Sequence, residues 1–277
     1  MDEELRMKTF SHSSLRCFLS FVLLSLPLWA FDHEHKTFTA LLQKHVVTTR
    51  EGASSQVDYA VLKKDPSELN RYLSELSQVE EKTFQSFSES QQLAFLINAY
   101  NAFTLKTVVD FYNPDPGNKT FVLKSIRDIC DTAKDCAWVG TGRVCKRKFF
   151  RLLGQEQSLD ILEHGMLRKD YKEPRIHFAI NCASIGCPKL ASQAYTAAQL
   201  EEQLRKATLS FLSDETRNRY DKTKNTLYLS QIFSWFEEDF TKAHKSVAAF
   251  VAPYLGNPTK ASIEYLPYNW NLNNKVH

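Results

Sequence analysis

The chain has 277 residues, of which 43% are hydrophobic, and its formal net charge at pH 7 is +3. This length and apolar content are sufficient for one domain with a substantial core. The net charge is small and the sequence has no basic block, so the composition excludes the strongly cationic class of nucleic-acid-binding proteins. We therefore expect no nucleic acid among the partners.

The N-terminal residues have the pattern of a targeting segment. Residues 17–30 form an apolar stretch of signal-peptide length, too short to span a bilayer comfortably, and polar residues follow it. We predict a signal peptide over residues 1–30, export to the periplasm or secretion, and no membrane span after its removal. Because the chain begins with acidic residues, Met7 is a candidate for the true start. An uncleaved N-terminal anchor is the alternative, since Leu28 to Ala30 match a cleavage site imperfectly.

Residues 31–277 contain no internal repeat, low-complexity tract or linker, which favours a single domain. Apolar residues at helical spacing occur within residues 31–50, and Pro66 opens a second helical pattern. Between them, residues 57–62 suit a short extended piece or a turn.

A central, buried helix is predicted from Ser90 to Phe111. Its sequence is apolar nearly all round and ends before a proline. Asn98 and Asn101 lie three positions apart and therefore share one face. A buried amide without a partner costs roughly 1–3 kcal/mol, so each must bond something. Either they bind backbone groups of neighbouring loops, or they line a pocket and orient a substrate, a water or a histidine.

The predicted mature chain keeps an odd number of cysteines. Removal of residues 1–30 leaves five of the six cysteines, so at least one thiol is unpaired or pairs outside the chain. An exported protein meets an oxidising compartment in which disulfides persist. Cys130 and Cys136 flank a short loop, and a disulfide between them is the leading structural expectation.

Residues 158–168 predict a helix with Ser158 as its N-cap. Asp160 and His164 lie four positions apart on this helix and can pair. An aspartate that holds an imidazole is the arrangement of many catalytic bases, but it is also an ordinary helix-surface pair. Both interpretations stay open.

Residues 175–190 concentrate more reactive side chains than any other window. Apolar and polar residues alternate from Ile176 to Asn181, which predicts a short strand, and a turn with two cysteines follows. On a straight strand His177 and Cys182 would face opposite sides, so only the turn could bring the thiol back toward the imidazole. An active site is expected at this stretch.

The C-terminal third alternates helical and extended patterns. Thr196 and Gln199 form a predicted capping box for a helix that continues to Phe211. Further helices are predicted at 232–240 and 247–255, and strands at 225–230 and 262–266. The whole pattern predicts an α+β fold, a single helix-rich domain with a small, mostly antiparallel sheet.

The run from His177 to Pro188, His-Phe-Ala-Ile-Asn-Cys-Ala-Ser-Ile-Gly-Cys-Pro, resembles the signature of the bacterial domain-of-unknown-function 547 family. The resemblance covers nearly all of the chain after residue 50, although relatives typically carry an acid at the position of Asn269. It implies family membership and no particular reaction. The other segments that agree with the family, in order, are residues 57–59, 94–102, 158–165, 229–236 and 265–273.

Three functions fit these residues. The first is a thiol-dependent hydrolase or transferase acting on a cell-envelope or peptide-like substrate, because a thiolate activated by a histidine is a strong nucleophile. The second is a redox or zinc site built from both cysteines with His177 or His164, although their spacing matches zinc ligands only loosely. The third is a non-catalytic ligand-binding envelope protein in which Cys182 and Cys187 form a structural disulfide.

We adopt the thiol enzyme as the leading hypothesis, with a small-molecule or peptide-like ligand and with no metal or cofactor. Its catalytic candidates are Cys182, Cys187, His177, His164 and Asp160. Its substrate-binding candidates are Asn98, Tyr100, Asn101, Arg175, Asn181 and Ser184.

Overall fold

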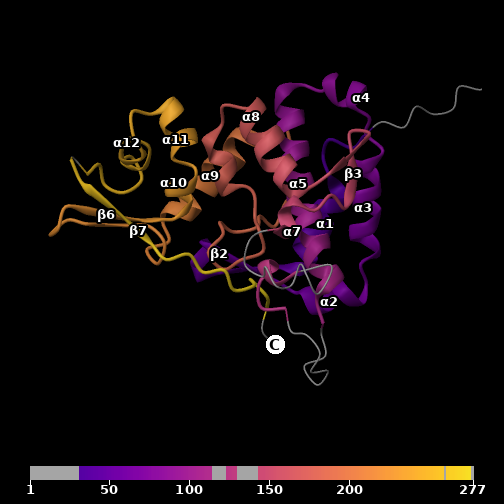
Figure 1. Cartoon of the computed structure of the whole chain (residues 1–277), viewed down its shortest axis with the longest axis horizontal. Helices are drawn as coiled ribbons and strands as arrows, with labels where there is room; N and C mark the ends of the chain where they lie inside the picture. Colours follow the sequence, from indigo (N-terminus) through magenta and orange to yellow (C-terminus); the bar gives the residue numbers. More distant parts are fainter. Residues whose placement is uncertain (1–30, 114–122, 130–142, 259, 276–277) are drawn as a thin grey trace, which may run out of the picture. The chain divides into compact units, whose positions relative to one another are not determined.

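The computed structural model describes residues 31–113, 123–129, 143–258 and 260–275. The chain divides after Ala30, and everything described here belongs to the unit of residues 31–277. Helices dominate these residues, and three small sheets accompany them (Figure 1). All of the strand pairs except one are antiparallel. The predicted helix-rich α+β class is confirmed, although the strands form separate small sheets instead of one.

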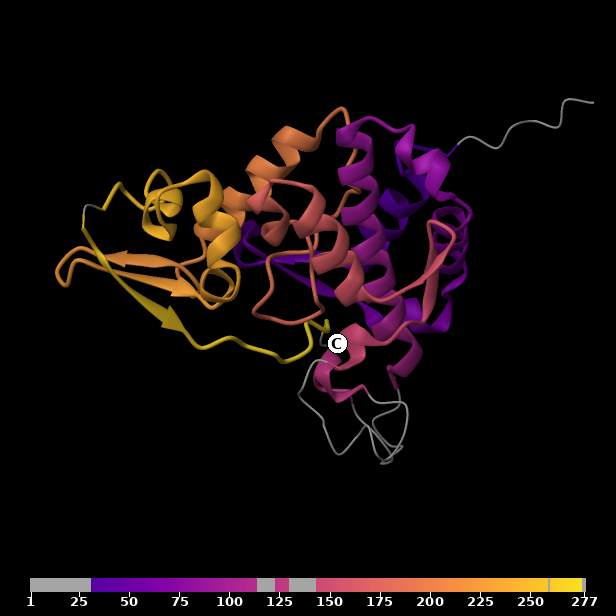
Figure 2. The same cartoon turned by 45° about the horizontal axis from the view of Figure 1, so that its top comes forward.

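Helix α5 (Glu89–Phe111) is the centre of the helical part, as its apolar sequence predicts (Figures 1 and 2). A capping box begins it: Ser88 Oγ accepts the Gln91 N–H at 3.3 Å, and Gln91 Oε1 accepts the Ser88 N–H at 2.9 Å. The helix is buried on nearly all sides between Leu93 and Val109. The candidate site described below packs against this helix.

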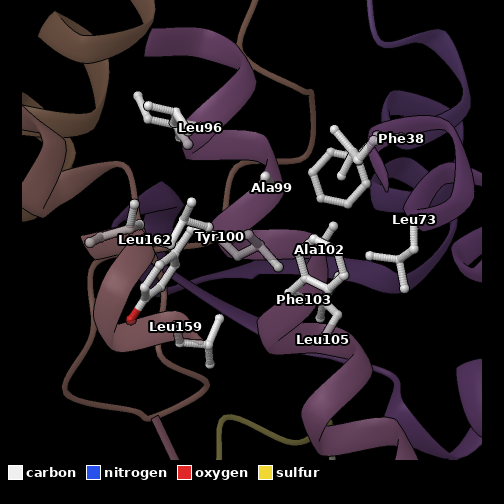
Figure 3. Close-up of a cluster of buried hydrophobic side chains, with 14 of the residues drawn as sticks. Phe38, Leu73, Leu96, Ala99, Tyr100, Ala102, Phe103, Leu105, Leu159 and Leu162 are labelled. Carbon is white, nitrogen blue, oxygen red and sulfur yellow. The ribbon is translucent and has the colours of Figure 1, made fainter. Parts of the chain in front are cut away.

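Side chains from distant parts of the chain cover α5 on both flanks. Figure 3 shows Phe38 and Leu73 on one side of the helix and Leu159 and Leu162 on the other. All four are buried in one apolar cluster with the α5 residues. The Tyr100 side chain extends from α5 toward Leu159 and Leu162, with its hydroxyl at the far end of the ring.

The N-terminal elements pack beside α5. The helix predicted within residues 31–50 ends at His45, where a hairpin of two antiparallel strands begins. Residues 57–62, predicted as a short extended piece or a turn, are mostly helical, because the Asp58 carboxylate accepts the Val61 N–H at 3.1 Å and caps a helix there. These elements are α1 (Lys36–His45), β1 (Val46–Thr49), η1 (Arg50–Gly52), β2 (Ser54–Val57), α2 (Tyr59–Lys64), α3 (Ser67–Ser77) and α4 (Glu81–Gln85).

The middle of the chain supplies most of the site. Ser158 Oγ accepts the Ile161 N–H at 3.2 Å, so the predicted helix begins as expected, but its next seven residues adopt π-helical geometry. π-Helical geometry is rare in proteins, and where it does occur it is often at a functional site. The elements are η2 (Ile126–Asp128), α7 (Arg143–Lys146), the antiparallel pair β3 (Phe150–Leu152) and β4 (Gln155–Gln157), η3 (Ile161–Leu167), α8 (Arg168–Asp170), η4 (Pro174–Phe178) and α9 (Leu200–Leu212).

The C-terminal elements enclose a second apolar cluster, rich in phenylalanine, which Phe178 joins from η4. Strand β6 pairs antiparallel with β5 and parallel with β7. After β7 the chain runs back toward the helical part (Figures 1 and 2). The predicted elements are present, but the helix expected at 232–240 is broken at Phe236. The bounds are β5 (Arg219–Asp221), β6 (Thr226–Ser230), α10 (Ile232–Trp235), α11 (Glu237–Ala243), α12 (Val247–Val251) and β7 (Ser262–Leu266).

The strand predicted from Ile176 to Asn181 is wrong. Pro174 begins the 3₁₀-helix η4, and the Glu173 carboxylate accepts the Arg175 N–H at 2.9 Å. Every residue from Ile176 to Asn181 is buried. The alternation therefore reflects burial on all sides and not the two faces of a strand.

The capping box predicted at Thr196 is also wrong. The Thr196 N–H donates to Gln203 Oε1 at 3.0 Å, and α9 begins only at Leu200. The predicted Cys130–Cys136 disulfide lies outside the described residues.

Candidate active site

Residues 181–188, called the thiol loop below, are closed by the side chain of Asn181. Asn181 Nδ2 donates to the Pro188 carbonyl at 2.7 Å, and Asn181 Oδ1 accepts the Ala183 N–H at 2.8 Å. The Asn181 N–H in turn donates to Asn101 Oδ1 at 2.8 Å, which ties the loop to α5. One amide thus joins both ends of the loop and fixes where its two cysteines lie.

The segment that follows β7 packs along the thiol loop. The Ile185 N–H donates to the Asn271 carbonyl and the Gly186 N–H to the Asn269 carbonyl, both at 2.8 Å. A Cβ on Gly186 would lie 2.9 Å from the Asn269 carbonyl oxygen and from the Tyr268 ring. The absence of a side chain at position 186 therefore lets the Tyr268 ring approach the cysteines.

Four groups that can donate a hydrogen bond surround the buried sulfur of Cys187. They are the Cys182 N–H at 3.1 Å, the Cys182 thiol at 2.6 Å, the Ser184 hydroxyl at 3.2 Å and the Tyr268 hydroxyl at 3.0 Å. A thiol is a weak acceptor, whereas a thiolate carries a full charge that several donors can stabilise. The environment of Cys187 thus favours its ionised form.

The two cysteines of the loop titrate in opposite directions. Burial opposes ionisation of Cys187, but hydrogen bonds from Cys182, Ser184 and Tyr268 outweigh it and lower the pKa of this thiol. The hydrogen bond to Cys187, followed by burial, raises the pKa of Cys182 well above its ordinary value. Of the two thiols, Cys187 is therefore the one whose surroundings favour ionisation.

Both cysteines of the thiol loop are free in the structure. Their Sγ atoms are 2.6 Å apart, which is longer than the roughly 2.05 Å of a disulfide bond. The structure thus contains no Cys182–Cys187 disulfide.

A cavity of about 560 Å³ lies beside the thiol loop. Its volume is within the range of small-molecule sites, which are roughly 300–1,000 Å³. Aromatic rings form much of its wall, together with side chains that can carry charge or move protons. The wall includes Tyr100, Trp235, Phe236, Tyr268, Trp270, Arg127, Lys146, Asp160, Glu163, His164, His177, Cys145, Cys182 and Cys187.

His177 is buried in the cavity wall and is oriented by Asp239. Its Nε2 lies 2.8 Å from Asp239 Oδ2, and its ring stacks on Phe236 with centroids 4.0 Å apart. An ionised carboxylate only accepts hydrogen bonds, so the proton of the neutral imidazole is on Nε2 and Nδ1 is the basic atom. Burial lowers the pKa of His177, and the bond to Asp239 opposes this. The side chain is therefore suited to accept a proton.

Asp239 also binds Arg168, and Arg168 connects it to His164. Arg168 Nε donates to Asp239 Oδ2 at 2.6 Å, and Arg168 Nη1 donates to His164 Nδ1 at 2.8 Å. Burial of Asp239 is outweighed by the hydrogen bonds from His177 and Arg168, which hold the pKa of its carboxyl below the usual range. The two candidate histidines are thus joined through one ion pair.

The predicted pairing of Asp160 with His164 is a loose contact. Asp160 Oδ1 lies 3.9 Å from His164 Nε2, too far for a hydrogen bond, and both side chains are partly exposed. Both residues line the cavity. His164 is held by Arg168 instead.

Glu163 faces the same cavity from η3. Its Oε2 accepts a hydrogen bond from the Tyr100 hydroxyl at 3.0 Å. Burial raises the pKa of the Glu163 carboxyl, against lowering by His164 and by the Tyr100 bond. A carboxyl with a raised pKa can keep a proton near neutral pH and donate it.

Of the six candidate binding residues, Tyr100 lines the cavity, whereas Asn98, Asn101, Arg175, Asn181 and Ser184 do not. Asn98 exchanges two hydrogen bonds with the backbone of Tyr195, at 2.7 and 2.9 Å. Asn101 binds the Ala179 carbonyl at 3.0 Å as well as the Asn181 N–H. Arg175 forms ion pairs with two glutamates on the protein surface. Asn98 and Asn101 therefore bind backbone groups, as the first of the two interpretations predicts, and support the site without lining the cavity.

Sequence reasoning missed several residues of the site. Glu163, Trp235 and Tyr268 lie within segments that carried the family resemblance, so that signal could have found them. Asp239 and Cys145 lie outside those segments. Only the folded chain places Asp239 against His177, 62 residues away in sequence.

Within the described residues, no set of three or more His, Cys, Asp and Glu side chains is arranged to hold a metal ion. The helices of these same residues are each too short or too polar to cross a membrane.

Comparison with known protein families matches residues 84–212 to the model of a protein of unknown function, DUF547. Comparison with curated proteins and with solved structures finds no match. The matched region contains α5, η3 and the thiol loop, whereas Asp239 and Tyr268 come from the chain that follows it. The match supports the assignment of residues 84–212 to the DUF547 family.

Proposed function

We propose that the protein is a thiol-dependent acyl-transfer enzyme, a hydrolase or a transferase, in which Cys187 is the nucleophile. The observation that supports this most is the set of four donors around the buried Cys187 sulfur, beside a cavity of ligand size. A buried anion is costly unless hydrogen bonds compensate it, so such an arrangement is typical of a working thiolate.

In the proposed reaction, the Cys187 thiolate attacks the carbonyl carbon of the substrate and forms a carbon–sulfur bond. The bond from that carbon to the leaving group breaks, and Glu163 supplies the proton that the leaving group takes up. Nδ1 of His177 then accepts a proton from water, or from an acceptor molecule, as it attacks the thioester and releases the thiolate. All three residues line the same cavity.

The walls of the cavity suggest a substrate with an apolar or aromatic part. Trp235, Tyr268 and Trp270 lie against one another, with ring centroids 4.6–5.5 Å apart. Arg127 stacks on Trp270 at 4.5 Å and adds a positive charge beside these rings. A peptide-like or envelope-derived substrate fits such a wall.

The proposal includes export to the periplasm or secretion. The signal-like pattern of residues 1–30 supports it, and so does the start of the compact unit at Phe31. N-terminal sequencing of the protein from its native compartment tests this part. A mature N-terminus near Phe31 is expected, and an intact leader would contradict cleavage.

The competing function is ligand binding without chemistry. The aromatic wall formed by Trp235, Tyr268 and Trp270 favours it, because such a surface can hold a ligand without any nucleophile. In that case Cys187 would be dispensable for function.

Acylation by p-nitrophenyl acetate separates the two functions. The reduced protein should release a burst of p-nitrophenolate and carry one acetyl group on Cys187, located by peptide mass spectrometry. The Cys187→Ser variant should lose the burst, while Cys145→Ser, which changes another cysteine of the same cavity, should keep it. Acetylation that is unchanged in Cys187→Ser, or absent from the wild type, would contradict the proposal and favour ligand binding.

A further inference from the structure

The acyl-transfer proposal assigns a role to Cys187 but leaves Cys182 unexplained. Cys182 Sγ is 2.6 Å from Cys187 Sγ, on the same rigid loop. A disulfide would need the sulfurs to approach by only roughly 0.5 Å, given a bond of about 2.05 Å. The two sulfurs are therefore placed for a disulfide bond between them.

The surroundings of the two sulfurs differ in a way that assigns an order of reaction. Cys187 Sγ accepts the Cys182 N–H at 3.1 Å and the Tyr268 hydroxyl at 3.0 Å, whereas Cys182 Sγ lies 3.5 Å from that hydroxyl. The Ser184 hydroxyl is nearly equidistant from the two sulfurs, at 3.2 Å from Cys187 and 3.3 Å from Cys182. In thiol–disulfide exchange the thiolate attacks first, and a neighbouring thiol resolves the mixed disulfide. Cys187 suits the first step and Cys182 suits the second.

We propose that Cys182 and Cys187 are a redox-active dithiol that reduces small disulfides, with Cys187 as the attacking residue and Cys182 as the resolving residue. This inference rests on the assignment of Cys187 as nucleophile in the proposed function. It adds an activity whose substrate class is a low-molecular-weight disulfide that enters the cavity. It also implies that the oxidised protein cannot carry out acyl transfer, because its nucleophile is then in a bond.

The exchange balances in two steps. The Cys187 thiolate attacks one sulfur of the disulfide, forms a mixed disulfide and releases the other half as a thiolate. Cys182 then attacks the Cys187 sulfur, forms the Cys182–Cys187 bond and releases the second half, which leaves with the proton of Cys182. Two electrons pass from the protein to the small disulfide, which becomes one thiolate and one thiol.

Treatment with glutathione disulfide tests this order, with intact and peptide mass spectrometry as the readout. The wild type should gain a Cys182–Cys187 bond and retain no glutathione. Cys182→Ser, and Cys182→Ala as a second variant, should keep glutathione attached to Cys187. Cys187→Ser should give neither product, and Tyr265→Phe in β7, which does not line the cavity, should behave as the wild type. Circular dichroism checks that each variant is folded.

Several outcomes would overturn the inference. Glutathione that stays on the wild-type protein, or that attaches first to Cys182, would contradict the assigned roles. If p-nitrophenyl acetate acetylates Cys187 but no Cys182–Cys187 bond forms, the dithiol activity fails and acyl transfer stands. If the bond forms without any acetylation, acyl transfer fails and the dithiol stands. If Cys187 reacts with neither reagent, both are wrong.

Discussion

Two regions of the molecule place a cysteine in the wall of the same cavity, with opposite consequences. In the thiol loop, four donors surround the Cys187 sulfur and lower its pKa. In α7, burial raises the pKa of Cys145 to about 12, and the nearby carboxyls of Glu163 and Asp160 add to this effect. Burial is common to both sulfurs, so the number of donors aimed at each one decides whether it ionises.

The largest expected effect is the difference in reactivity between these two cysteines. With iodoacetamide at pH 7, Cys187 should react at least about 30-fold faster than Cys145, because its larger thiolate fraction outweighs the lower nucleophilicity of a low-pKa thiolate. Alkylation rates measured peptide by peptide check this ratio. Equal rates at the two sites would remove the contrast between the two regions.

Removal of one donor should bring Cys187 closer to the behaviour of Cys145. Tyr268→Phe deletes the hydroxyl that lies 3.0 Å from the Cys187 sulfur. A hydrogen bond to a charged group is worth about 1.5–3 kcal/mol, so the pKa of Cys187 should rise by about 1 to 2 units. The pH dependence of Cys187 alkylation measures the shift, with Tyr265→Phe in β7 as the matched control. A pKa shift of the same size in Tyr265→Phe would show that the shift does not come from the loss of the Tyr268 hydroxyl.

Ser184→Ala should act in the same direction and less strongly. The Ser184 hydroxyl is shared between Cys187 at 3.2 Å, Cys182 at 3.3 Å and Tyr268 at 3.0 Å. We expect the pKa of Cys187 to rise by about 1 unit or less, since the lost donor was only partly committed to that sulfur. Alkylation across pH measures it, and a larger effect than that of Tyr268→Phe would reverse the assigned ranking.

The same rule applies to a buried imidazole far from the cavity. Burial lowers the pKa of His35 to about 3, while its Nδ1 lies 2.7 Å from the Tyr72 hydroxyl. The unfolded chain binds this proton near pH 6.5, so His35 destabilises the fold as pH falls from about 6.5 toward 3, by up to about 1.4 kcal/mol per pH unit.

His35→Asn tests the pH effect without removing the polar contact. Asparagine can bind the Tyr72 hydroxyl and tolerates the left-handed backbone at this position, where φ is 47°. The free energy of unfolding of the His35→Asn variant should fall less steeply below pH 6.5 than that of the wild type. Denaturant titrations at several pH values would show this. Identical slopes would mean that His35 is not held neutral.

The sequence predicted the helical frame better than the site. The all-round apolar pattern of α5 identifies a buried helix, because few other structures bury every face, and the strands at 225–230 and 262–266 follow from their alternation. The alternation from Ile176 to Asn181 misled because a short 3₁₀-helix buried on all sides shows the same letters as a strand.

The chemistry of the site depends on contacts between distant parts of the chain. Cys182, Cys187 and His177 were identified from their residue types and proximity in sequence, and all three line one cavity. The groups that orient or activate them, Asp239 and Tyr268, lie 62 and 81 residues further along the chain, and no local pattern links them. The resemblance marked the segment of Tyr268 but not its role, since a motif does not reveal what a side chain contacts.

The pH dependence of Cys187 alkylation in the fully reduced wild-type protein tests the central claim most directly. If the surrounding donors hold this sulfur as a thiolate, the midpoint of its reactivity will lie clearly below the ordinary thiol value of about 8.5. A midpoint at or above that value would contradict the account, because Cys187 would then be an ordinary buried thiol and the cavity would have no activated nucleophile.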